Sequence, residues 1–175
     1  MKHDLYGVSK IEIGAPGDGV MGTIFDEYLD IVKDSVSLVM PEPDTVEIYS
    51  ETEQTSPYKI IPKQSEGAKL EFALYGVDMS KFPDFLGGTW DDVNKKWIAP
   101  RTLTVIYKSV RITTSETDAE GNKLAVEMPY ASIVAGIDGK LSSENLASLK
   151  VTCKAQVPIA ADGTKGDPLV IAETV

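Results

Sequence analysis

Hydrophobic and polar residues alternate in six stretches of the chain, and this period of two is typical of β-strands with one buried and one exposed face. The alternating stretches are residues 10–13, 35–48, 70–76, 102–114, 123–130 and 149–157. We expect residues 102–114 to form the longest strand. Pro41 and Pro43 interrupt the second stretch, and because proline cannot donate a hydrogen bond to a sheet, this part predicts a bend, a bulge or an edge.

The alternation is most regular in residues 149–157, which predicts a strand with one face buried and the other in water. The residues of the buried face are Leu149, Val151, Cys153, Ala155 and Val157. Cys153 is the only cysteine of the sequence. At this position we expect a buried, unreactive thiol rather than a nucleophile, since no second His or Cys is present to activate it.

Residues 78–88 carry the clearest helix signal of the sequence. Asp78 or Ser80 can cap the N-terminus, and Gly87 can end the helix. Side chains three and four residues apart lie on one face of a helix. The face that we expect to pack against the rest of the domain consists of Phe82, Phe85 and Leu86.

Three segments show little or none of this alternation. Residues 1–33 include a glycine-rich stretch at 14–19, which predicts a flexible N-terminal arm. Residues 50–68 form a long polar connector loop, and a connector of this length is usually functional or ordered by a partner. Residues 158–175 are rich in Gly, Pro and Asp and predict a C-terminal tail.

Several strands separated by turns, with one short helix, predict an all-β fold, or an α+β fold if the helix is counted. We expect an antiparallel β-sandwich or small barrel with one flanking α-helix. The sequence shows no internal repeat and no interdomain linker, so residues 1–175 are expected to form a single domain. The 16 Val, 14 Ile and 13 Thr residues agree with this, because branching at Cβ favours sheets.

Charge and composition narrow the classes of partner. The chain has 27 acidic and 17 basic residues, a net charge of −10, which disfavours a free nucleic-acid-binding protein because phosphates are repelled. One His (His3) and one Cys leave no Cys/His zinc site and no internal disulfide. No apolar run approaches the roughly 20 residues that span a bilayer, and the N-terminus lacks a secretory signal. We therefore expect a soluble protein with no membrane partner.

Candidate catalytic patterns have plainer explanations, and we expect no enzyme activity, no cofactor and no metal ion. The glycine-rich stretch at 14–19 lacks the Gly-Lys-hydroxyl ending of a phosphate loop. The carboxylate pairs Asp91/Asp92 and Glu51/Glu53 lie in polar stretches, whereas a glycosidase needs two carboxyls held across a cleft. No pair of nucleophile and base is evident.

Trp90, Trp97 and Tyr107 suggest an alternative, because three aromatic rings can stack on a sugar. That interpretation is a monomeric β-sandwich module that binds carbohydrate or protein. Aromatic residues of this kind more often close the end of a sandwich or pack at an interface. The alternative therefore stays open beside a structural role.

The order of these elements resembles the major tail tube proteins of tailed bacteriophages over residues 8–160. A glycine-rich arm, a proline-broken strand and a long acidic connector precede a strand that enters a short helix, and a Trp-bearing loop, two hairpin strands and an amphipathic strand follow. The stretches that carry the resemblance are 70–76, 81–88, 97–110 and 128–133.

The resemblance implies a β-sandwich flanked by one helix, and self-assembly into hexameric rings that stack into a hollow tube of the virion. Partners would be further copies of the chain and other tail proteins, with DNA passing through without specific binding. Before assembly the chain would lie in the bacterial cytoplasm. By this resemblance the connector at 50–68 matches the extended loop that reaches a neighbouring subunit or ring, through Glu51, Glu53, Gln54, Pro57, Tyr58, Ile60 and Ile61.

In the same way, the N-terminal arm and the tail after Val157 match segments that join rings. A different virion part, such as a tail-completion or head-decoration protein, shares the β-rich composition and is a second alternative. For a tube, we expect part of the excess negative charge to line the channel, because Lys and Arg would hold phosphates and stall the passage of DNA.

Overall fold

The structure is a computed structural model that describes residues 7–63, 67–102, 104–115, 121–139 and 146–174. This part of the chain is mostly β-strand, with one short α-helix, α1 (Phe82–Leu86), that follows a turn of 3₁₀-helix, η1 (Met79–Lys81). The strands are β1 (Lys10–Gly14), β2 (Phe25–Tyr28), β3 (Ser37–Val39), β4 (Thr45–Ile48), β5 (Lys59–Pro62), β6 (Lys69–Leu74), β7 (Thr89–Asp91), β8 (Lys96–Ile98), β9 (Ile106–Thr113), β10 (Lys123–Asp138), β11 (Ser148–Ala155) and β12 (Val170–Thr174).

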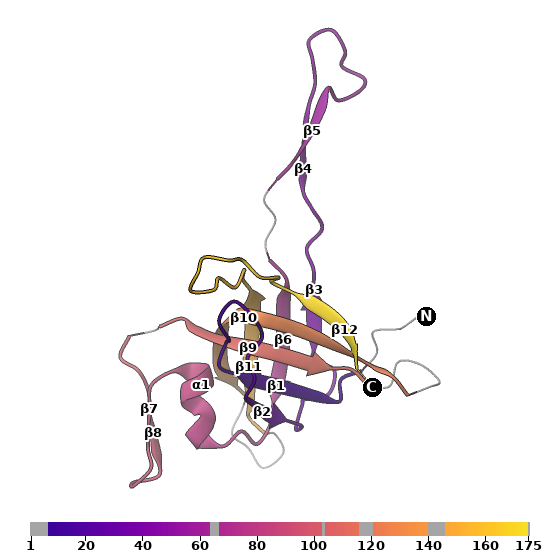
Figure 1. Ribbon diagram of the computed structural model, residues 1–175. Coiled ribbons are helices and arrows are strands. Elements are labelled where there is room, and N and C mark those ends of the chain that lie inside the picture. Colours follow the sequence, from indigo (N-terminus) through magenta and orange to yellow (C-terminus); the bar gives the residue numbers. More distant parts are fainter. Residues whose placement is uncertain (1–6, 64–66, 103, 116–120, 140–145, 175) are drawn as a thin grey trace.

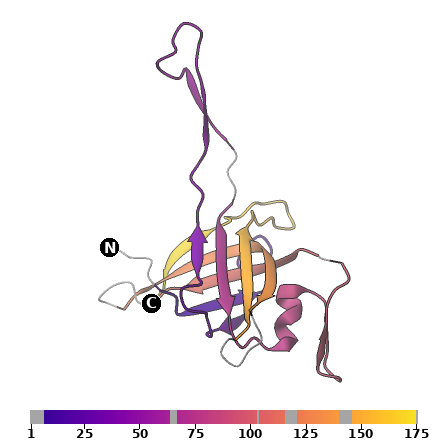
Figure 2. The same ribbon diagram turned by 180° about the vertical axis from the view of Figure 1, so that it is seen from behind.

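Eight strands form one antiparallel sheet in the order β2-β1-β9-β10-β11-β6-β3, with β12 also paired to β10. The long strand β10 changes neighbours along its length. Its first half pairs with β9 and β12, its second half pairs with β9 and β11, and the register shifts between Met128 and Ala131, around Pro129. Figures 1 and 2 show the result, in which β3, β6 and β11 form one layer and β1 and β9 form a second layer that crosses it at a steep angle.

The two layers also meet along a second margin. Ile31, just after β2, forms a bridge with Leu74 of β6, and the amide of Val32 donates to the carbonyl of Ala73 at 2.9 Å. The core lies between the layers, and its largest fully buried side chains include those of Phe72, Phe85, Ile11, Leu70 and Met128. The expected all-β class with one short helix is confirmed.

The helix lies where the sequence predicts it. The carboxylate of Asp78 accepts a hydrogen bond from the amide of Ser80 at 2.8 Å, and the chain leaves the helix at Gly87, which has φ of 70°. Of the predicted packing face, Phe85 is buried, and Phe82 and Leu86 are half-buried.

The buried face of the last predicted strand is confirmed for four of its five residues, Leu149, Val151, Cys153 and Ala155. The prediction is wrong for Val157, because β11 ends at Ala155 and Val157 is 46% exposed. The chain turns away where the amide of Gln156 donates to the carbonyl of Tyr130, and Pro158 takes the buried position instead.

The prediction of a flexible arm at 1–33 is wrong for the residues from 7 onward. β1 and β2 are integral strands of the main sheet, and Ile11 and Ile13 are buried in the core. The glycines serve a tight return of the chain, since a Cβ on Gly14 would lie 2.0 Å from the carbonyl oxygen of Ile24. His3 lies outside the described residues.

Two further expectations about strand extent are wrong. The predicted tail at 158–175 contains β12, which pairs with the first half of β10. The longest strand is β10, with 16 residues, whereas β9 has 8 within the predicted 102–114. Leu103 of that stretch lies outside the described residues.

The prolines of residues 35–48 act as expected, because the chain leaves the main sheet between β3 and β4. The connector at 50–68 is not a simple loop. It contains β5, which pairs with β4 in a separate two-stranded sheet. We call residues 40–63 the long hairpin, and residues 89–98, where β7 pairs with β8, the short hairpin.

Candidate assembly surface

The long hairpin projects from the body of the domain. It continues beyond the ends of β3 and β6, and its strands lie clear of the other described elements (Figures 1 and 2). The register pairs Thr45 with Pro62, Val46 with Ile61 and Ile48 with Lys59. Every residue of β4 and β5 is exposed. An isolated two-stranded hairpin is marginally stable in water at best.

The exposed surface of the long hairpin is unusually apolar. Because side chains alternate along a strand, Val46, Ile48 and Ile61 share one face, and Ile60 lies on the other. Tyr49 and Tyr58 flank the tip, and Tyr58 is 81% exposed. Exposed apolar residues that cluster in this way mark interaction sites, and tyrosine is enriched at protein interfaces.

The tip of the long hairpin is also acidic. Residues 41–58 contain five carboxylates and no Lys, Arg or His. The hydroxyl and amide of Thr55 hydrogen-bond the carboxylate of Glu53 and lower its pKa, so Glu53 is charged at neutral pH. The hydroxyl of Tyr49 donates to Glu47, which raises the pKa of Tyr49.

The residues that the sequence singled out for assembly therefore lie together in one projecting element. Glu51, Glu53, Gln54 and Pro57 belong to the tip, Tyr58 follows it, and Ile60 and Ile61 belong to β5. All are exposed except Pro57, which is half-buried. The sequence reasoning missed the other strand, β4, although Val46 and Ile48 alternate in the same way and are exposed too.

The short hairpin is anchored on the helix. Trp90 and Trp97 are directly paired across its strands. The indole N–H of Trp97 donates to the carbonyl of Gly87 at 2.8 Å, and the ring meets Phe82 edge-on with centroids 5.7 Å apart. Tyr107 instead stacks on Tyr130, at 4.8 Å between centroids. The three aromatic residues thus pack in two separate groups and do not form one stacking platform.

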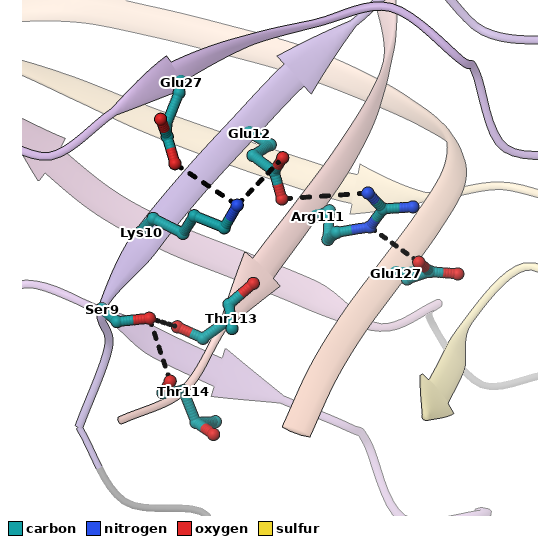
Figure 3. A network of polar contacts seen from close by, with 8 residues as sticks. All are labelled: Ser9, Lys10, Glu12, Glu27, Arg111, Thr113, Thr114 and Glu127. Carbon is teal, nitrogen blue, oxygen red and sulfur yellow. Dashed lines mark hydrogen bonds and ion pairs between the residues drawn. The ribbon is translucent and has the colours of Figure 1, made fainter. Parts of the chain in front are cut away.

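The outer face of the layer that holds β1 and β9 carries a ladder of alternating charges (Figure 3). Lys10 contacts both Glu27 and Glu12 at 3.3 Å. Arg111 contacts Glu12 at 3.8 Å and donates from Nε to Glu127 at 2.7 Å. The ladder crosses β2, β1, β9 and β10, so both of its cations are paired with carboxylates of the same subunit.

The other candidate groups are internally satisfied. Asp91 accepts two hydrogen bonds from Asn94, which lower its pKa, and Asp92 pairs with Lys95 at 2.7 Å. Burial raises the pKa of the Cys153 thiol to about 12. Within the described residues, no group of three or more His, Cys, Asp or Glu side chains is placed to hold a metal ion.

A hollow of about 580 Å³ opens at one end of the core. It is lined mainly by apolar side chains of both layers, with Lys33 and Asp34 at its margin. Leu70, Ile112 and Val126 on its wall are core residues. The hollow lacks the group of convergent polar side chains that fixes a small ligand in place.

The chain matches no protein-family model and no curated protein.

Of the helices in the described part of the chain, none has the length and apolar character needed to cross a membrane.

Proposed function

We propose that the chain is a structural subunit that assembles with copies of itself into stacked rings, forming the DNA-conducting tail tube of a bacteriophage or prophage. In this role it would be part of the virion. The observation that carries the proposal is the long hairpin, which exposes Val46, Ile48 and Ile61 on one face and Tyr58 beside its tip. Such an element gains stability only when a partner covers it.

Sheet edges support a second kind of contact. Among the described strands, β12 pairs only with β10, and β3 pairs only with β6. An open strand edge is a template for pairing with another chain. Edge pairing related by rotation closes a ring, whereas a contact made along the ring axis repeats without end. A tube needs both kinds of contact.

The charge of the chain suits a conduit for DNA. A net charge of −10 repels phosphates at long range, so a wall made of such subunits does not hold the DNA that passes it. Under this proposal, DNA passes through the tube, and the subunit makes no sequence-specific contact with it.

The proposal is tested by replacing residues 42–62 with a short Gly-Ser linker. Because β4 and β5 contribute no residue to the core, we expect the variant to fold, with unchanged circular dichroism and a cooperative thermal transition. We expect it to form no tubes in negative-stain electron microscopy under conditions in which the unaltered chain forms them. Absence of tubes from the unaltered chain at every concentration would contradict the proposal, and normal tubes from the folded variant would show that the long hairpin does not carry the assembly.

A further inference from the structure

The outer face of the layer that leads into the long hairpin carries an excess of positive charge. Three lysines project from it, Lys69 of β6 and Lys150 and Lys154 of β11. Two exposed valines lie on the same face, Val134 opposite Thr152 and Val39 opposite Lys69. We call this surface the lysine face; it consists of Val39, Lys69, Val134, Lys150 and Lys154.

The lysine face keeps an excess of positive charge within the subunit. Glu71 of β6 lies on the same face, where Lys69 and Lys150 both lower its pKa, but it is a single carboxylate against three lysines. Lys69 pairs with Glu71 at 2.7 Å, but neither Lys150 nor Lys154 makes a salt bridge with a carboxylate of the described residues. Lys154 lies directly opposite Lys69 in the antiparallel register, and like charges in this position destabilise a sheet. This is the reverse of the charge ladder, where each cation lies between two carboxylates.

The long hairpin has the complementary character. Its residues 40–63 carry five carboxylates and two lysines, of which Lys63 pairs with Asp44 at 3.2 Å, so the hairpin has an excess of negative charge. Its apolar face and two tyrosines are uncovered. The lysine face combines valines with positive charges, and the long hairpin combines apolar side chains with negative charges. The two surfaces are therefore complementary in charge, and each offers apolar side chains to the other. Opposed potentials of this kind steer association and fix its register.

We propose that the long hairpin of one copy docks on the lysine face of a second copy. This inference rests on the proposed function and names the surface that receives the hairpin. The contact is heterologous, because the hairpin and the face are different parts of the chain. Between copies displaced along one direction, such a contact repeats from copy to copy without closing.

The reach of the hairpin allows this contact. At about 3.3 Å per residue, the chain between the end of β3 and the tip spans at most about 45 Å, whereas β6 and β11, which carry the three lysines, are about 20–26 Å long. The hairpin continues the direction of β3 and β6 away from its own body (Figure 2). A copy displaced along that direction presents its own β3, β6 and β11 beside the hairpin.

Docking also removes a difficulty for a DNA conduit. Uncovered lysines bind phosphates and release counterions, which would hold a passing polyanion. Carboxylates of a neighbouring hairpin would neutralise Lys150 and Lys154 in the assembly.

The test reverses charges on either side of the contact in the full-length chain. Lys150→Glu with Lys154→Glu is expected to raise the concentration needed for tube formation by about tenfold or more. Glu42→Lys with Glu51→Lys, two carboxylates that make no hydrogen bond or salt bridge with the described residues, is expected to do the same. The matched control is Lys33→Glu with Lys165→Glu, which changes the net charge equally at exposed positions outside the lysine face. We expect the control to assemble like the unaltered chain.

Mixing the two reversed variants separates a contact between copies from one within a copy. Each variant then meets an oppositely charged partner, so an equimolar mixture is expected to assemble near the concentration of the unaltered chain, as measured by sedimentation and electron microscopy. Failure of the mixture, with recovery only when all four changes lie in one chain, would overturn the proposal in favour of a contact within the subunit. Full assembly of each reversed variant alone would overturn it and leave the proposed function standing. Absence of tubes from the unaltered chain would instead refute the proposed function.

Discussion

The two hairpins that leave the domain differ in whether their apolar residues pack against the domain or lie exposed. The short hairpin is fixed by Trp97, which donates to the carbonyl of Gly87 and packs against Phe82. The long hairpin exposes every residue of both its strands. An aromatic contact and a hydrogen bond thus anchor the short hairpin on the domain, whereas no residue of β4 or β5 is buried against it. The short hairpin is therefore expected to stabilise the subunit, whereas under the proposed function the long hairpin acts between subunits.

The largest effect is expected from making the apolar face of the long hairpin polar. Ile48→Ser with Ile61→Ser should abolish tube formation, because both side chains would be buried against a partner. The thermal stability of the isolated subunit should change little, since both residues are exposed. Pelleting of tubes and a thermal melt measure the two effects.

A matched substitution in the short hairpin controls for the loss of any exposed apolar pair. Val93 and Ile98 are both exposed, and we expect Val93→Ser with Ile98→Ser to leave assembly intact. Equal loss of tubes from both pairs of substitutions would remove the distinction between the hairpins.

A smaller effect is expected at Trp97, the anchor of the short hairpin, and it concerns the stability of the subunit rather than its assembly. Trp97→Ala removes a half-buried ring and its hydrogen bond, so it should lower the free energy of unfolding by about 2 kcal/mol and the melting temperature by roughly 4–8 °C. Trp97→Phe, which retains a ring against Phe82, should recover part of the loss. An unchanged melting temperature for Trp97→Ala would show that the short hairpin is not anchored.

The smallest effect concerns the cap of η1, the turn that precedes the anchoring helix. Hydrogen bonds from Ser80 lower the pKa of Asp78 from its usual 3.8. A carboxyl with a lowered pKa stabilises the fold above its ordinary pKa, and this contribution is lost as the pH falls through the lowered value. Asp78→Ala should therefore reduce stability slightly at pH 7 and less at pH 2.5, whereas Asp78→Asn should retain much of the cap. A difference between Asp78→Ala and the unaltered chain that is the same at both pH values would contradict this.

The sequence predicts those parts of the fold in which one face of a strand is buried. β6, β9 and β11 were found because Leu70, Phe72 and Leu74, and the corresponding residues of the other two, alternate with polar ones. The helix was found from Asp78 and Gly87, which act locally. In each case the signal is contained within a few consecutive residues.

The remaining elements depend on contacts that a local pattern does not contain. β5 places Ile60 and Ile61 next to each other and ends in a proline, so its strand character comes only from pairing with β4. β10 continues past Pro129 because the register shift accommodates the proline in the middle of a long strand. For the same reason the candidate surface was predicted only in part, as residues of a connector, and the lysine face emerged only when register placed Lys69 opposite Lys154.

The most direct measurement is negative-stain electron microscopy of the purified full-length chain over a range of concentrations. The account predicts hollow tubes with a regular axial repeat above a threshold concentration, and smaller species below it. A monomer that persists at every concentration, with the long hairpin protected from proteases, would contradict the central claim that this chain functions by joining copies of itself.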